Sequence, residues 1–223
     1  MAASASQAPP GAAARAVVRR SSVRGQILDA LRAALANGEL RPGEVYSAPA
    51  LGERFGVSAT PVREAMQQLT LESAVEVVPN RGFRVLQRGA RELAELAEVR
   101  ALIEVPVLLR LADTVPVERW SALRPLAEAT VRVASSGSRA GYAESDRAFH
   151  HAMLSLSGNE QLVRIAGDLH RRSQWPPLGV AGRAPRAGLL SDAADHMALL
   201  DAFIARDTDR LQVLVQRHFD PTG

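Results

Sequence analysis

Residues 57–66 carry the pattern that most restricts how this chain can fold, because they describe a short amphipathic helix with a defined start. Ser58 is a favoured N-cap residue, and Pro61 falls in the first turn, where its missing N–H costs little. The apolar face carries Val62, Ala65, Met66 and Leu69, and the opposite face carries Thr60, Arg63, Glu64 and Gln67. We therefore expect a helix that buries one face and offers the other to a DNA groove.

The segments before this helix predict two further helices. Apolar residues recur every four positions over about 22–37, and Gly38 favours a left-handed stop. After a turn, Ser47 is expected to open a short second helix that ends at Gly56. Because the helix that starts at residue 57 follows at once, the segments together predict a helix-turn-helix.

Two short apolar runs downstream predict a β-hairpin. Residues 75–78 and 83–85 are rich in Val and Phe, and they flank the turn sequence of residues 79–82. The tight turn places Arg81 and Gly82 at its tip. A hairpin after a helix-turn-helix makes a winged domain, whose wing can reach the adjacent minor groove or the DNA backbone.

The charge distribution agrees with DNA binding by the first part of the chain. Residues 1–88 contain 11 Arg and 7 acidic residues, a net charge of +4, whereas residues 89–223 contain 16 Arg and 17 acidic residues, a net charge of −1. All 27 basic residues are Arg, together with abundant Ala, which we attribute partly to genome composition. The high pI by itself is therefore weak support for a DNA partner.

The expected DNA contacts come from the recognition helix, the helix before it and the wing. They are Ser58, Thr60, Arg63, Gln67, Arg54, Arg81, Gly82 and Arg84. Arg63 is expected to read bases, whereas Arg54, Arg81 and Arg84 are expected to contact phosphates, which take the larger share of protein–DNA hydrogen bonds. The alternative for Arg63 is a solvated side chain that pairs with its neighbours Glu64 or Gln67.

Composition excludes several other classes of protein. The chain contains no cysteine, which excludes disulfides, thiolate metal sites and cysteine nucleophiles and fits a reducing cytoplasm. No segment approaches the roughly 18 apolar residues of a membrane span, so no membrane partner is expected. Residues 1–20 lack the apolar core of a signal peptide and are interpreted as a flexible tail, in which Arg15, Arg19 and Arg20 are candidate phosphate contacts.

From residue 91 onward the pattern is helical throughout. The predicted helices cover about 91–112, 117–135, 139–157, 160–175, 188–206 and 208–219. Pro106 is expected to kink the first of these helices, and residues 176–188 are expected to form a long loop.

These patterns predict a mostly α protein with two domains. After the tail, a winged helix-turn-helix domain with a small β-hairpin wing covers residues 21–88. An all-α domain of six helices covers residues 89–223.

Four polar residues fall on the inner, apolar faces of the predicted helices in the second domain. They are Asp146, His150, His196 and His218. A lone inward His is more often a satisfied core residue, but four inward residues that are all good metal ligands favour a shared metal site. Imidazole and carboxylate donors suit Zn, Ni, Mn or Fe. His151 is expected to be exposed or to lie behind the ligands, and His170 is interpreted as a surface or pocket-rim residue.

Arg100 also lies on an apolar stripe, so its guanidinium is expected to point toward the core of the second domain. A buried guanidinium needs an anionic partner. That partner is either an internal carboxylate, Glu104 or Asp146, or the carboxylate of a bound effector molecule. Arg171 and Arg172 are candidates for a second anchor of such an effector.

Three motifs in the first domain agree in order and spacing with a known family. They are Gly38-x-Leu40-x-Pro42-Gly43, Gly56-Val57-Ser58-x-Thr60-Pro61-Val62-Arg63-Glu64-Ala65 and Arg81-Gly82-Phe83-x-Val85. Together they resemble the winged-helix domain of the GntR family of bacterial regulators over about residues 22–87. Ala59 departs from the pattern, because the family usually has an Arg there, so base reading is expected to be weaker than in relatives or altered.

The helical remainder is similar to the FCD effector domain of the FadR subfamily. The matching positions include Leu96-x-x-x-Arg100-x-x-x-Glu104, Asp146-x-x-Phe149-His150, Gly158-Asn159, His196, Asp207 and His218. In that family an Asp and three His at the matching positions bind a divalent metal. The resemblance implies a metal-dependent site for a small carboxylate, held in part by Arg100.

Taken as a whole, the resemblance implies a ligand-responsive transcriptional regulator rather than an enzyme. Such a protein binds a palindromic operator on double-stranded DNA as a homodimer, and repression relieved by an effector is the expected arrangement. One alternative is a DNA-binding protein with a purely structural metal and no effector. A second alternative is a metal-dependent hydrolase, which would leave the helix-turn-helix unexplained.

Overall fold

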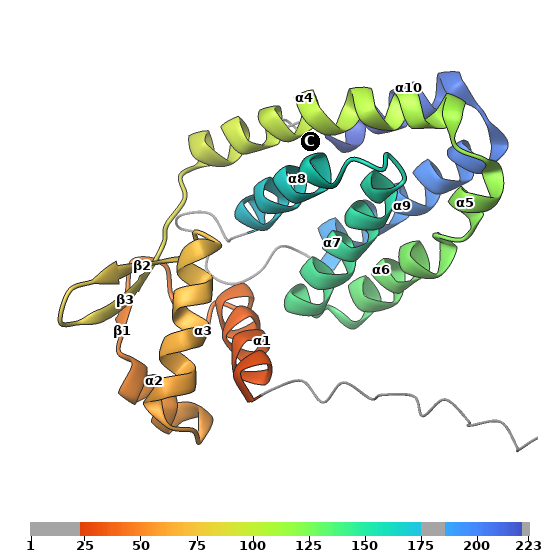
Figure 1. The fold of residues 1–223 in the computed structure, drawn as a ribbon. Coiled ribbons are helices and arrows are strands. Elements are labelled where there is room, and N and C mark those ends of the chain that lie inside the picture. The colour runs from red at the N-terminus through yellow and green to blue at the C-terminus, as the bar shows by residue number, and fades with distance from the viewer. Residues whose placement is uncertain (1–22, 175–185, 220–223) are drawn as a thin grey trace, which may run out of the picture.

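A computed structural model describes residues 23–174 and 186–219 of the chain (Figure 1). The predicted tail over residues 1–20 and most of the predicted loop over residues 176–188 lie outside the described residues. A winged helix-turn-helix domain leads into α4, the long helix that crosses the top of the helical domain in Figure 1. The predicted fold class is confirmed.

The first domain contains three helices and a small antiparallel sheet. Its elements are α1 (Val23–Ala36), β1 (Val45–Tyr46), α2 (Ala48–Phe55), α3 (Ala59–Leu71), β2 (Val75–Val78) and β3 (Gly82–Val85). Every apolar residue predicted on the inner face of α3 is buried: Val62, Ala65, Met66 and Leu69. These side chains pack with Leu31, Leu35 and Leu51, so hydrophobic burial holds α3 with its polar face outward.

Helix starts and stops in this domain follow local side-chain chemistry. Ser47 caps α2, since its Oγ accepts a hydrogen bond from the backbone N–H of Ala50 at 3.2 Å. Gly56 ends α2 in the left-handed conformation, with φ 67°. Ser58 occupies the N-cap position of α3, but its hydroxyl makes no capping hydrogen bond. The Ser58 side chain is exposed, so its hydroxyl can meet another partner.

The predicted hairpin is present, and the structure adds a third strand. The strand order is β1-β3-β2, with both pairs antiparallel. Strand β1 could not be predicted from the sequence, because two residues are too few to show an alternating pattern. The presence of β1 explains why residue 82 is a glycine. Its φ is +130°, and a Cβ atom there would lie 2.3 Å from the Tyr46 carbonyl oxygen. Only glycine fits this close approach between β1 and the wing.

The second domain is all-helical in the part of the chain that the structure describes. Its helices are α4 (Ala90–Thr114), α5 (Val117–Ser121), α6 (Arg124–Ser136), α7 (Arg139–Ser155), α8 (Glu160–Ser173), α9 (Arg186–Ala205) and α10 (Thr208–His218). The helix predicted over residues 117–135 is two helices, because Pro125 lacks an N–H and starts α6 instead of continuing α5. The residues around Pro106 remain helical, and α4 runs through them as one element.

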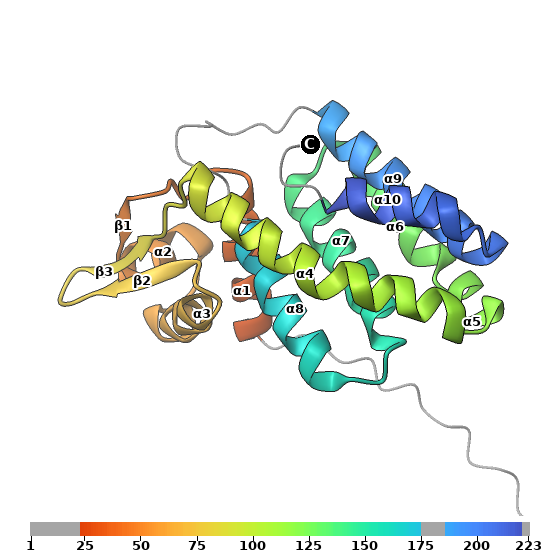
Figure 2. The same cartoon turned by 90° about the horizontal axis from the view of Figure 1, so that it is seen from above.

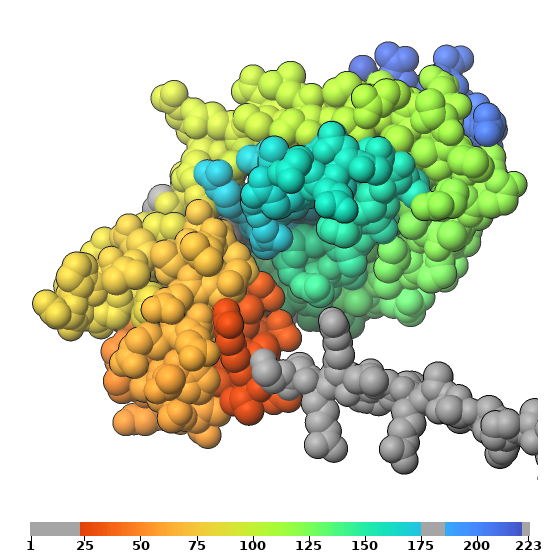
Figure 3. Space-filling model, in the orientation of Figure 1, coloured from red at the N-terminus to blue at the C-terminus, as the bar shows by residue number. Residues whose placement is uncertain are grey.

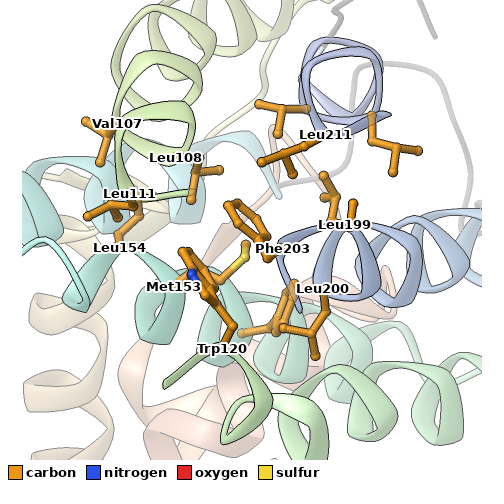
Figure 4. Close-up of a cluster of buried hydrophobic side chains, with 14 of the residues drawn as sticks. Val107, Leu108, Leu111, Trp120, Met153, Leu154, Leu199, Leu200, Phe203 and Leu211 are labelled. Carbon is orange, nitrogen blue, oxygen red and sulfur yellow. The ribbon is translucent and has the colours of Figure 1, made fainter. Parts of the chain in front are cut away.

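The core of this domain lies between α4, α5, α7, α9 and α10. Trp120 and Phe203 stack at its centre with ring centroids 3.8 Å apart, and Leu108 and Met153 pack around them (Figure 4). Burial of these side chains fixes the helices that carry the inward polar residues. No helix in the described segments is long and apolar enough to cross a membrane.

Arg88, on the segment between β3 and α4, joins the two domains. Its side chain is 5 % exposed, its Nη2 donates to the Ser73 carbonyl at 2.6 Å, and its Nε donates to the Arg172 carbonyl at 3.1 Å. Glu92 neutralises the guanidinium. Because Ser73 follows α3 and Arg172 lies in the last turn of α8, one buried side chain ties the DNA-binding domain to α8. Figure 2 shows α8 lying along α4, which begins at this junction.

Candidate metal centre and DNA-binding surface

The four inward polar residues predicted as metal ligands come together in the helical domain. Asp146 and His150 lie on α7, His196 on α9 and His218 on α10. Asp146 Oδ1 is 3.4 Å from His150 Nε2 and 3.2 Å from His196 Nε2. His218 Nε2 is 3.1 Å from His150 Nε2. Three helices thus direct their donor atoms into one cluster.

His170 also belongs to this cluster. The expectation of a surface position was wrong, because the side chain is buried, whereas the alternative of a pocket-lining position is confirmed. His170 is 4 % exposed, and its Nε2 lies 2.8 Å from Asp146 Oδ2. The donors form two overlapping groups with ligand atoms within 4.8 Å of one another: His150, His196 and His218, and Asp146, His150 and His170. A signal was present in the sequence, since Leu162, Ala166 and His170 are spaced four residues apart on α8.

Hydrogen bonds on the far side of two imidazoles fix which ring nitrogen faces the cluster. His150 Nδ1 lies 3.3 Å from the carboxylate of Glu104, which can only accept, so Nδ1 carries the proton. Thr130 donates its hydroxyl proton to the Ala127 carbonyl at 2.7 Å and therefore accepts from His196 Nδ1 at 3.2 Å. In a neutral imidazole this leaves the Nε2 lone pair of both rings directed into the cluster.

The resulting arrangement of lone pairs fits a cation. His196 Nε2 is fully buried and has no hydrogen-bond partner among the described residues. His150 Nε2 and His218 Nε2 are close enough that their lone pairs repel unless a proton or a cation lies between them. An Asp oxygen and three imidazole nitrogens are donors that a divalent transition metal accepts.

Hydrogen bonds orient Asp146 so that one of its carboxylate oxygens faces the other donors of the cluster. Its Oδ2 lies 2.8 Å from both His170 Nε2 and Gln174 Nε2, which leaves Oδ1 facing His150 and His196. Burial alone would raise the pKa of Asp146, but His170 and the surrounding imidazole hydrogen bonds hold it well below its usual range. The carboxylate is therefore ionised at neutral pH.

The imidazoles opposite Asp146 are mostly neutral. Burial lowers the pKa of His218, with further lowering by His150 and His196, and burial likewise lowers the pKa of His196. Burial and then Arg100 lower the pKa of His170 to about 4. His150 differs, because Asp146 and Glu104 outweigh burial and raise its pKa. Neutral imidazole is the form that binds a metal ion.

Glu104, expected from the sequence as a possible partner for Arg100, also contacts the donor cluster. Its side chain is 1 % exposed and lies between Arg100 Nε, at 2.8 Å, and His150 Nδ1. Burial would raise the pKa of Glu104, but Arg100 and His150 together lower it to about 2. The spacing of Leu96, Arg100 and Glu104 placed it on the inner face of α4, but nothing in the sequence indicated contact with α7.

The two predicted effector anchors differ in position. Arg100 forms the internal ion pair with Glu104, which is one of the alternatives that the sequence left open, and its Nη1 lies 3.3 Å from Ser173 Oγ. Its guanidinium also stacks over the Phe219 ring at 5.5 Å. No described contact brings the Arg172 side chain to the cluster, and its Nε is buried without a hydrogen-bond partner. His151 is exposed.

The predicted DNA-contact residues lie on one domain, and most are exposed. Along α3, Ser58, Thr60, Arg63 and Gln67 face solvent, opposite the buried stripe. Arg54 pairs with Glu39, and Arg84 pairs with Glu76 at 2.7 Å. Within the described residues, Arg63 and Arg81 form no ion pair, so both guanidiniums are available to an anionic partner. Gly82 is half-buried against β1 and shapes the wing.

An exposed recognition helix with a wing, joined to a helical domain that carries a buried donor cluster, defines the class of DNA-binding transcriptional regulators. Family comparison agrees with this class. The model of the gntR family of bacterial regulatory proteins matches residues 23–85, and that of the FCD domain matches residues 95–221. The chain belongs to the GntR family of regulators and carries an FCD domain. Members of this family are regulators and not enzymes.

Individual relatives support the same assignment. The chain is 30 % identical over 191 residues to the HTH-type transcriptional repressor GlaR of Escherichia coli, covering 81 % of this chain and 85 % of that protein. It is 27 % identical over 205 residues to a probable D-xylose utilization operon transcriptional repressor of Paenarthrobacter nicotinovorans, covering 89 % and 86 %. The structure of Escherichia coli McbR/YncC shares the fold, with a TM-score of 0.70, 24 % identity and coverage of 90 % and 95 %.

Proposed function

We propose that this regulator is a repressor that binds a palindromic operator as a homodimer and responds to a small carboxylate at a metal centre. The observation that carries this proposal is that Asp146, His150, His196 and His218 come together in one buried cluster. Because Arg88 ties the DNA-binding domain to α8, which carries His170, a change at that point can reach the recognition helix.

The metal would be held by Asp146 Oδ1 and the Nε2 atoms of the three histidines. His170 and Gln174 orient the Asp146 carboxylate, while Glu104 and Thr130 orient two of the rings. The donor set fits Zn, Ni, Mn or Fe. A bound metal with open coordination positions supplies an electrophilic site for the oxygens of an effector carboxylate.

Arg100 would take part in binding the same carboxylate. It pairs with Glu104, whose carboxylate also contacts His150 Nδ1, so the guanidinium lies close to one of the proposed metal ligands. Its pairing with Glu104 leaves it only partly exposed, with 14 % of the side chain accessible. An effector that binds one domain placement more tightly than the other shifts the equilibrium between them and so changes operator affinity.

A homodimer and a palindromic operator are proposed because of the small size of the winged domain. One winged domain contacts only a few base pairs, and two copies related by a twofold axis read two half-sites of a palindrome. Repression is proposed because two of the similar proteins are named repressors. The second candidate function is a DNA-binding regulator with a purely structural metal, which a metal saturated by protein ligands would favour.

Arg63→Ala is expected to weaken binding to the specific operator by about 1–3 kcal/mol, because this guanidinium is unpaired on the exposed face of α3. Arg81→Ala should instead weaken binding to all duplexes evenly. It should also reduce the slope of log binding constant against log salt concentration by about one unit, as expected for a phosphate contact. Gel-shift titrations on operator and scrambled duplexes separate the two effects. Equal losses on both duplexes for Arg63→Ala would contradict base reading.

A small carboxylate is expected to bind only to metal-loaded protein and to change operator affinity by about 5- to 150-fold. By thermodynamic linkage, operator DNA must change the affinity for the acid by the same factor. Calorimetry with a panel of metabolic acids on metal-loaded, chelated and Arg100→Gln protein tests this. The Gln variant keeps a hydrogen-bond donor for Glu104. An active acid that binds equally well after chelation would rule out metal-mediated sensing.

A further inference from the structure

A cavity of about 330 Å³ lies between the two domains, and none of the four proposed metal ligands lines it. One side is formed by α1 of the DNA-binding domain and the other by α7 and the end of α8. Figure 3 shows the N-terminal domain, in red to orange, meeting the teal helices at this boundary. The volume is at the lower end of the range for small-molecule sites, which suits a ligand of about one ring.

The apolar part of the cavity lining is made of alanines from both domains. Ala33 and Ala36 lie on α1, and Ala140 and Ala143 lie on α7. All four are half-buried, so they exclude part of the water without filling the space between the helices. Such small side chains leave room for an apolar body that would touch α1 and α7 at once.

Arg147 gives the cavity a recognition group that is already positioned. Its Nη1 donates to Gln174 Oε1 at 2.5 Å, and its Nη2 pairs with Glu144, whose side chain is 69 % exposed. An ion pair with so exposed a partner contributes little to stability. A ligand carboxylate can therefore displace Glu144 into water, while Gln174 continues to orient the guanidinium for charge-assisted hydrogen bonds.

Two other arginines line the cavity. Arg171 pairs with Asp168 on its own helix, and Arg32 differs from Arg147 in the burial of its partner. Arg32 is bound by both oxygens of Glu72, at 3.2 and 2.5 Å, and the Glu72 side chain is buried. Displacing Glu72 would leave a buried carboxylate without its partner, which is costly. Arg147, rather than Arg32, is therefore the side chain able to exchange its partner for a ligand.

Gln174 connects the cavity to the metal cluster. Its Nε2 donates to Asp146 Oδ2 at 2.8 Å and to the Ala143 carbonyl at 3.1 Å, while its Oε1 accepts from Arg147. The same amide thus orients a proposed metal ligand and the cavity arginine. Both sites share this one side chain, although their ligand-contacting atoms differ.

We propose that this interdomain cavity is a second ligand site, for a small organic acid whose ring-sized apolar body lies against the four alanines and whose carboxylate pairs with Arg147. Its occupant touches both domains directly. A further part of the proposal rests on the proposed function: acid binding in the cavity changes operator affinity, because it favours one relative placement of the two domains.

The test uses benzoate as the probe, with acetate lacking the ring and benzyl alcohol lacking the charge. Isothermal calorimetry on the full chain should show saturable benzoate binding with a Kd of about 1 mM, a value typical of a ligand of this size. Acetate and benzyl alcohol should bind at least about tenfold more weakly, because each lacks one of the two recognised groups.

Four protein forms then locate the site. Ala143→Leu, which fills the cavity, and Arg147→Gln should each weaken benzoate binding at least about tenfold, whereas Ala94→Leu, the same change on the exposed face of α4, should not. Chelated wild-type protein should retain benzoate binding within about threefold, which separates this site from the metal centre.

Two results would overturn the proposal. One is the absence of saturable benzoate binding to folded wild-type protein. The other is binding that chelation abolishes and Ala143→Leu leaves intact, which would place the acid at the metal and support the proposed function instead. Conversely, benzoate binding that survives chelation and is lost in Ala143→Leu supports the cavity site even where no metal-dependent acid is found.

Discussion

Replacing both His196 and His218 by Ala is expected to abolish binding of about one divalent metal per chain and to remove the stabilisation that the metal supplies. The two side chains come from α9 and α10, and their proposed partners Asp146 and His150 come from α7. Only the folded state brings these donors together, so metal binding and folding are linked. Free metal at 100 times its Kd would stabilise the fold by about 2.7 kcal/mol, or about 5–11 °C in melting temperature.

Elemental analysis after extensive dialysis measures the metal, and thermal melts with and without a chelator measure its contribution to stability. His151→Ala is the matched control, because His151 is the exposed neighbour of His150. Chelation should lower the melting temperature of wild type and His151→Ala, but not that of the double variant. This comparison removes the effect of core cavities left by the Ala substitutions. Wild-type protein that cannot be loaded with Zn, Ni, Mn or Fe would refute the metal centre.

Glu104→Ala is expected to destabilise the fold by about 3–5 kcal/mol, because it leaves the largely buried Arg100 guanidinium without its carboxylate. It also removes the acceptor that orients His150, and loss of such a group weakens metal binding by about 10- to 100-fold. Glu104→Gln keeps the shape and one oxygen acceptor, so it should fold better while still binding metal more weakly. Glu98→Ala, on the exposed face of the same helix, is the control.

The pH dependence of the Glu104 contribution has a defined sign. Its pKa is about 2 in the folded protein against 4.5 for an unperturbed Glu, so its ionised form is favoured by folding. The stabilisation is fully present above pH 4.5 and is lost as the pH falls toward 2. Denaturant unfolding from pH 7 to 3 should therefore show a steeper loss of stability for wild type than for Glu104→Gln. Parallel curves for the two proteins would contradict this role of the carboxylate.

The recognition helix and the faces of the long helices could be predicted because their signals are local. The stripe of Val62, Ala65, Met66 and Leu69 in α3 needs only the helical period and a buried side to be interpreted. The helical period likewise predicts that Asp146, His150, His196 and His218 lie on inner faces. Each of these inferences depends on positions within a single element.

Features that depend on contacts between distant segments could not be predicted in this way. Strand β1 exists because its two residues pair with β3, and Trp120 of α5 stacks on Phe203 of α9. The contact of His170 with Asp146 was not predicted, because Asp146 lies on a different helix. Local periodicity shows that a side chain points inward, but it does not show what the side chain meets there.

By itself, the sequence determined a winged helix-turn-helix followed by helices with inward metal-type donors, since hydrophobic periodicity and turn chemistry act over a few residues. Only the tertiary structure decided that His170 supports Asp146, that Glu104 and Thr130 set the ring orientations, and that Arg88 joins the domains. These contacts depend on how whole helices pack, and packing follows from the sum of many small burial energies across the chain rather than from any one segment.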